Sequence, residues 1–83
     1  MSNLARTPKQ IGNIIRSARK KKGLNQTQLG DLAGLRQETI SMIESGNLAT
    51  KLDTLLALLA ALDMEFKIGP RSKSAASDIE DIF

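Results

Sequence analysis

The stretch that most constrains the fold is residues 24–46, LNQTQLGDLAGLRQETISMIESG. Two short segments with helical periodicity flank a glycine, which predicts two helices of about two turns each across a tight turn. Asn25 suits the N-cap of the first helix, because its side chain can accept from an N–H of the opening turn. Gly34 can adopt the left-handed conformation that ends it. The apolar residues predicted to share one face of this helix are Leu29, Leu32 and Ala33.

The second helix of the pair is predicted over residues 37–45 and places Ile40 and Ile43 on its inner face. Leu35 fills the turn before it, and Gly46 ends it. Two short helices across a glycine turn are the geometry of a helix-turn-helix, whose second helix enters the major groove of DNA. The outer face of that helix consists of Gln37, Glu38, Ser41 and Met42.

A longer helix is predicted before this pair. Thr7 suits its N-cap, Pro8 its first position and Gln10 its third, which is the pattern of a capping box. The helix is expected to end at Gly23, with Leu24 folding back onto its last turn. Its buried stripe is predicted to be Ile11, Ile14, Ile15 and Ala18.

A leucine-rich fourth helix is predicted over residues 51–62, with Thr50 as its cap. Its leucines cover more than one face, so a second subunit could bury those that the rest of the chain leaves exposed. The next residues alternate between apolar and charged, as in a strand: Met64, Glu65, Phe66, Lys67 and Ile68. Since a strand must pair and the sequence offers no second one, we expect it to pair with its copy across a dimer.

The fold class predicted is all-α, with four helices and one short strand that pairs between subunits. Residues 1–69 are expected to form the DNA-binding and dimerisation domain, and residues 70–83 a flexible C-terminal tail. Residues 78–83, DIEDIF, combine acidic with apolar side chains. They either fray in water or become ordered on a partner protein.

Composition argues against catalysis. The chain has no cysteine and no histidine, which removes disulfides, thiolate metal sites and the commonest general base. It also has no glycine-rich loop for phosphates and no evident pair of catalytic carboxylates. We therefore expect no enzymatic activity, no metal and no cofactor. Without a signal peptide or an apolar run long enough to span a membrane, a cytoplasmic location without membrane association is expected.

Charge is unevenly distributed along the chain. The net charge is +3, but residues 1–22 contain seven basic residues and no acidic one. Such a basic end suggests contact with phosphate. Lys20, Lys21 and Lys22 also have a local explanation, because cations stabilise the negative end of a helix dipole.

The stretch 24–46 resembles the helix-turn-helix of Xre/Cro/C1 repressors, and with its flanks the resemblance covers residues 8–62. The shared features are the glutamine after the N-cap, Leu-x-x-Leu-Ala-Gly, Ile-Ser-x-Ile-Glu and the closing glycine. An unrelated helical hairpin is the alternative. The resemblance implies a four-helix, lambda-repressor-like fold and an ion pair between Arg19 and Glu44.

The same resemblance implies roles for the exposed residues of the two helices. The residues expected to contact bases are Gln37, Glu38, Ser41 and Met42. Those expected to contact or position phosphate are Asn25, Gln26, Thr27, Arg36, Thr39 and Ser45. Glutamine suits bidentate recognition of adenine, and Gln26 is expected to support Gln37. Glu38 either accepts from cytosine N4 or repels phosphate and so excludes wrong registers.

A second, shorter resemblance is to HipB-type antitoxins, carried by LDMEFKIGPR and IEDIF. It implies a homodimer that binds an inverted-repeat operator, represses its own operon and binds a HipA-type kinase toxin. The residues expected to touch the toxin are Ile79, Ile82 and Phe83. The alternative is a stand-alone Xre-family or phage-type repressor without a toxin partner.

Overall fold

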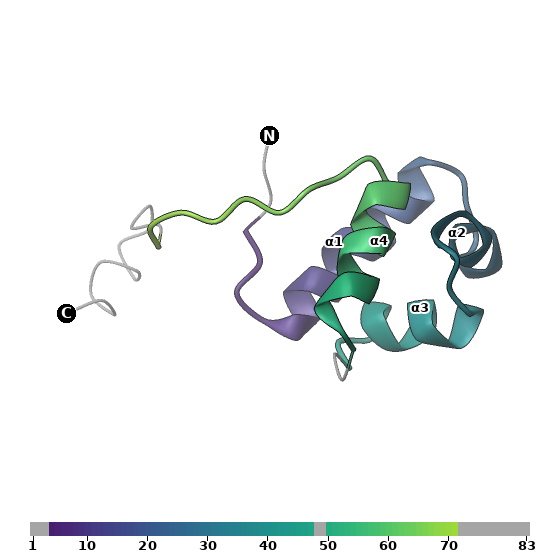
Figure 1. Cartoon of the computed structure of the whole chain (residues 1–83), viewed down its shortest axis with the longest axis horizontal. Coiled ribbons are helices and arrows are strands. Elements are labelled where there is room, and N and C mark those ends of the chain that lie inside the picture. The colour runs from purple at the N-terminus through teal and green to yellow at the C-terminus, as the bar shows by residue number, and fades with distance from the viewer. Residues whose placement is uncertain (1–3, 48–49, 72–83) are drawn as a thin grey trace.

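The computed structural model describes residues 4–47 and 50–71 (Figure 1). These residues form four helices, α1 (Pro8–Lys21), α2 (Gln26–Ala33), α3 (Gln37–Glu44) and α4 (Leu52–Ala61), and none of them lies in a strand. The all-α, four-helix prediction is therefore confirmed, whereas the strand predicted at residues 64–68 does not form within the single chain. Among the described residues, no helix combines the length and the hydropathy that a membrane span requires.

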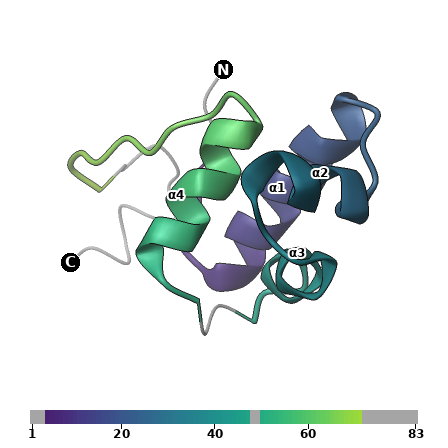
Figure 2. The same cartoon turned by 45° about the vertical axis from the view of Figure 1, so that its right-hand side comes forward.

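The helices enclose one aliphatic core. α3 packs against both α1 and α2, and α2 also packs against α4 (Figure 2). Each helix contributes at least one buried side chain, and each such burial contributes about 1.5–3 kcal/mol to folding. The core consists of Ile15, Leu29, Ile40, Ile43, Leu55, Leu58, Leu59 and Leu62.

Local sequence sets the starts of α1 and α2. The hydroxyl of Thr7 accepts from the backbone N–H of Gln10 at 3.1 Å, and the Gln10 side chain accepts from the N–H of Thr7, also at 3.1 Å. The same reciprocal box joins Asn25 and Gln28, at 2.7 and 2.8 Å. Each box satisfies two donors that a helix start otherwise leaves unpaired.

The predicted cap of the fourth helix is wrong. Lys51, not Thr50, occupies the N-cap position of α4, and no side chain caps this helix. Because α4 begins one residue later than a Thr50 cap requires, the Thr50 hydroxyl does not accept from the first turn.

α1 and α4 end in the same backbone motif but with different residues. Gly23 ends α1 at φ 71°, and the N–H of Leu24 donates to the carbonyl of Arg19 at 3.2 Å. At the end of α4, Asp63 takes φ 63°, and the N–H of Met64 donates to the carbonyl of Leu59 at 2.8 Å. Aspartate tolerates this conformation better than most residues, and the turn folds Met64 back toward the core.

Leu32, predicted on the apolar face of α2, is 63% exposed, so its assignment to the core is wrong. The buried face of α2 is centred on Leu29, Gly30 and Ala33. At 100° per residue, Leu32 lies on the other side of Leu29 from Gly30 and faces solvent.

Residues 64–71, which we call the arm, leave α4 and run back past the start of α1 (Figure 1). Residues 65–71 make no backbone–backbone hydrogen bond to another described residue. Phe66 is 41% exposed and Ile68 is 98% exposed. On α4, Leu52 and Leu56 are exposed as well, as expected of a helix that is apolar on more than one face.

Candidate nucleic-acid interface

The polar face of α3 is the main exposed feature of the helix pair. Ile40 and Ile43 are fully buried and anchor the helix to the core. The opposite side presents four residues to solvent, those predicted to contact bases: Gln37, Glu38, Ser41 and Met42. An α-helix of this kind fits the major groove of B-DNA.

A buried ion pair joins α1 to the end of α3. Arg19 Nε donates to Glu44 Oε2 at 2.7 Å and Nη2 donates to Oε1 at 3.0 Å, so the pair is bidentate. Nη1 donates to the carbonyl of Leu24 at 2.8 Å. The hydrogen bond with Glu44 raises the pKa of Arg19 above its ordinary value, against the lowering effect of burial. The ion pair expected from the family resemblance is therefore present.

Gln26 connects this ion pair to the DNA-facing side of α3. Its Nε2 donates to Glu44 Oε1 at 3.1 Å, and its Oε1 accepts from Nε2 of Gln37. An ionised carboxylate only accepts hydrogen bonds, so Glu44 fixes which end of the Gln26 amide faces it. Gln26 must then turn its oxygen toward Gln37, which fixes the amide of Gln37 in turn.

This arrangement leaves Gln37 suitable for contact with a base. One N–H of its amide donates to Gln26, so its oxygen and its second N–H remain for another partner. These two groups are what bidentate recognition of adenine requires. Because the side chain is already oriented, less rotamer freedom would be lost on binding.

The network combines two predictions that the family resemblance implies separately. The ion pair and the support of Gln37 by Gln26 were both expected, but the bond between Gln26 and Glu44 was not. The two residues lie 18 positions apart on different helices, so no periodicity links them. Only the packing of α2 on α3 brings them together.

The residues predicted to contact phosphate lie at the start of α2 and along α3. Thr27 and Arg36 are exposed, and Arg36 is the N-cap residue of α3 without a side-chain capping bond. Asn25 uses its oxygen in the α2 cap, which leaves its amide N–H groups as donors. The hydroxyl of Ser45 donates to the carbonyl of Met42 at 2.9 Å, and Thr39 is half-buried.

The ion pair also changes the charge of this surface. The helix pair contains three acidic residues, which would oppose attraction to phosphate. Glu44 is buried and paired with Arg19, so it contributes little net charge to the surface. Asp31 and Glu38 are exposed, and both add negative charge to this surface.

Four packed helices, a glycine turn between α2 and α3, and an exposed polar face on α3 define a helix-turn-helix DNA-binding domain. The chain belongs to the helix-turn-helix family HTH_3, which it matches over residues 15–68. The resemblance to Xre/Cro/C1 repressors is thereby confirmed. The family is one of DNA-binding transcription regulators.

Two curated relatives agree with this class. An uncharacterized HTH-type transcriptional regulator of Haemophilus influenzae is 42% identical over 60 residues, which cover 71% of this chain and 61% of the relative. The uncharacterized regulator y4dL of Sinorhizobium fredii is 31% identical, over 92% of this chain and 44% of the relative. The chain thus spans less than two thirds of the length of either relative.

Solved structures give the same fold. A HipB variant in complex with an O2 20mer has a TM-score of 0.78 and 25% identity, over 87% of this chain and all of the solved HipB chain. A chain of a HipA–HipB–O2–O3 complex has a TM-score of 0.77. The restriction-modification controller protein C.AhdI from Aeromonas hydrophila has a TM-score of 0.66 and 34% identity, over 70% of this chain and 88% of C.AhdI.

Proposed function

We propose that this chain is a sequence-specific repressor that binds an inverted-repeat operator as a homodimer. The observation that carries the proposal is Gln37, exposed on α3 and oriented by a hydrogen-bonded network that ends in a buried ion pair. In the proposed complex, Gln37, Glu38, Ser41 and Met42 contact bases. Phosphate is contacted by Asn25, Gln26, Thr27, Arg36, Thr39 and Ser45.

The homodimer accounts for apolar surface that one chain leaves exposed. Leu52 and Leu56 on α4 and Phe66 and Ile68 on the arm all face solvent. After Met64, the arm makes no backbone–backbone hydrogen bond to another described residue. Strand pairing with a second chain would supply such bonds. In a two-fold dimer the half-site centres lie about 34–36 Å apart, one turn of DNA.

The proposal is tested by selecting operators from random DNA and measuring the affinity of variants for the selected site and for random duplex. Gln37→Ala should cost about 1–3 kcal/mol on the operator and relax the preference at one base pair. Arg36→Ala should weaken both DNAs alike and flatten the salt dependence. Asn13→Ala, an exposed residue of α1, is the control. Equal losses on both DNAs for Gln37→Ala would refute its role in recognition.

We further propose that the repressor is the antitoxin of a HipBA-type module that represses its own operon. The likeness to HipB over 87% of the chain supports this assignment. The residues predicted to bind the toxin, Ile79, Ile82 and Phe83, lie outside the described residues. Copurification of the natively expressed chain with a HipA-type kinase tests the proposal, and deletion of residues 78–83 should then weaken the complex.

A stand-alone regulator is the second candidate. C.AhdI, a restriction-modification controller protein, is more similar in sequence than HipB, at 34% against 25% identity. Purification of the native protein without any bound kinase, together with intact operator binding, would favour this candidate.

A further inference from the structure

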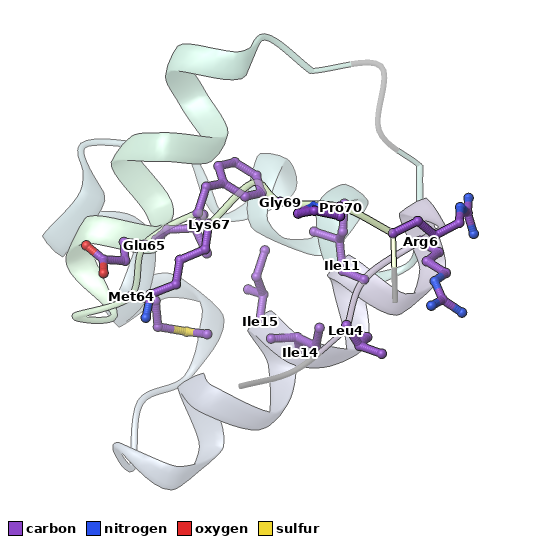
Figure 3. A pocket seen from close by; sticks show the side chains of 14 residues that line it. Leu4, Arg6, Ile11, Ile14, Ile15, Met64, Glu65, Lys67, Gly69 and Pro70 are labelled. Atoms are coloured by element: carbon purple, nitrogen blue, oxygen red, sulfur yellow. The ribbon is translucent and has the colours of Figure 1, made fainter. Parts of the chain in front are cut away.

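A groove of about 700 Å³ lies between α1 and the arm, and we call it the α1 groove. Ile11, Ile14 and Ile15 extend into it from α1, and Met64 borders one end while Leu4 borders the other (Figure 3). Its volume is within the range of clefts that bind a ligand. The charged residues that line it are Arg6, Lys67, Arg71 and Glu65.

A second depression of about 380 Å³ continues along the outer face of α1. It shares Ile14 and Met64 with the α1 groove and reaches Lys21. The combined surface is apolar along its centre and has cationic residues near both ends. An occupant should therefore combine apolar side chains with negative charge.

Residues 78–83, which we call the acidic segment, have this composition. Ile79, Ile82 and Phe83 are spaced at i, i+3 and i+4, so they would share one face of a helical turn. The other three residues are Asp78, Glu80 and Asp81, without a basic residue among them. The segment is thus complementary to the groove in both polarity and charge.

The acidic segment is also tethered within reach of the groove. Arg71, the last residue described, itself lines the groove, and only residues 72–77 separate it from the segment. Six extended residues span up to about 20 Å, which is enough for the chain to turn back. A tether this short gives an effective concentration in the millimolar range, so even a weak contact would be occupied.

We propose that the acidic segment docks in the α1 groove of its own chain, with its apolar face on Ile11 and Ile14. Docking covers apolar surface in the chain without a partner, and it keeps Ile79, Ile82 and Phe83 away from other proteins. A protein that binds the segment must displace it from the groove. This inference goes beyond operator binding and does not depend on the existence of a toxin.

The experiment uses the absence of cysteine, because a single introduced cysteine takes a spin label at one position. Ser77→Cys places the label directly before the acidic segment in the full chain. NMR signals of Ile11, Ile14 and Met64 should broaden when the label is oxidised, while that of Leu32, exposed on α2, stays sharp. Spin-labelled chain is also mixed with isotope-labelled chain that has no spin label. Broadening in this mixture reports only contacts between chains, which separates them from contacts within one chain.

Two variants test the chemistry of the contact. Replacing Ile79 and Ile82 by aspartate should abolish the broadening, and Arg71→Glu should reduce it. Lys20→Glu makes the same charge change on α1 away from the groove and should leave the broadening unaltered. Absence of broadening in the parent chain, or broadening seen only between chains, would overturn the proposal. Either result would leave operator binding by α3 unaffected, so the two proposals fail independently.

Discussion

At the residue scale, one buried carboxylate organises the surface proposed to contact DNA. Glu44 accepts from Arg19 on α1 and from Gln26 on α2, and Gln26 in turn holds Gln37. A buried charge of this kind is stable only while its partners remain, because each one compensates for lost hydration. The same residues therefore affect both the stability of the domain and the orientation of Gln37.

Removal of one member of the ion pair should destabilise the domain strongly. Arg19→Met leaves Glu44 buried without its cation, so we expect a loss of about 3–5 kcal/mol in the free energy of unfolding. Urea denaturation followed by circular dichroism measures it. Lys20→Met, its exposed neighbour, should change stability by less than about 0.5 kcal/mol. A double replacement with Glu44→Leu should recover part of the loss, and equal effects of Arg19→Met and Lys20→Met would contradict the prediction.

Gln26 and Gln37 should act as one unit in operator binding. Gln26→Ala removes the bond that orients Gln37, so part of its effect should vanish once Gln37→Ala is present. A double-mutant cycle on a selected operator should give a coupling of about 0.5–3 kcal/mol, measured by titration with labelled DNA. The cycle of Thr27 with Gln37 is the control and should be near additive. Additive losses for Gln26 and Gln37 would show that the bond has no part in recognition.

At the scale of elements, the position of α1 on α3 depends on backbone contact at Gly12. A Cβ atom at this position would lie 2.5 Å from the carbonyl oxygen of Ile43 and 2.6 Å from that of Glu44. This close approach brings the end of α3 against α1, where Arg19 meets Glu44. A Cβ atom at Gly30 of α2 would likewise lie 2.6 Å from the carbonyl oxygen of Leu35 in the turn.

Gly12→Ala should destabilise the domain, although helix propensity alone predicts the opposite. Alanine in a helix interior is favoured over glycine by about 0.8–1.0 kcal/mol. The clash with the α3 backbone outweighs this gain, and we expect a net loss of about 1–3 kcal/mol by thermal or urea denaturation. Ser17→Ala, on the exposed side of α1, should instead be neutral or slightly stabilising. A more stable Gly12→Ala variant would mean that α1 and α3 are not in this contact.

At the scale of the whole molecule, α4 and the arm leave apolar side chains exposed in the single chain. An antiparallel pairing of two arms about a two-fold axis through Phe66 would place Glu65 of one chain opposite Lys67 of the other, twice. Each opposite-charge pair contributes about 0.2–1 kcal/mol. A register centred on Glu65 or Lys67 would instead place like charges face to face.

The Phe66-centred register is tested by charge exchange. Lys67→Glu should loosen the dimer in sedimentation equilibrium and weaken operator binding, because it turns both cross-strand pairs into repulsions. Adding Glu65→Lys should restore both properties, since the pairs return with reversed polarity. Lys22→Glu, directly after α1, controls for net charge in the sedimentation measurement. Failure of the double variant to recover would rule out this register.

Much of the fold was determined by the sequence itself. The capping residues Thr7 and Asn25, the left-handed Gly34 and the polar face of α3 are as predicted. Each depends on interactions within about four residues along the chain, such as a capping bond or a helical period. The paired Arg19 and Glu44 were expected only through the family resemblance, because they lie 25 positions apart in the sequence.

The tertiary structure alone decided the remaining features. Leu32 is exposed because the direction from which α3 and α4 approach α2 sets its buried face. Asp63 takes the left-handed turn that a glycine more often takes, and Met64 folds back behind it. The need for glycine at position 12 and the bond between Gln26 and Glu44 arise where helices distant in the sequence touch. Local periodicity carries no information about which helices will meet, and it is their meeting that orients Gln37.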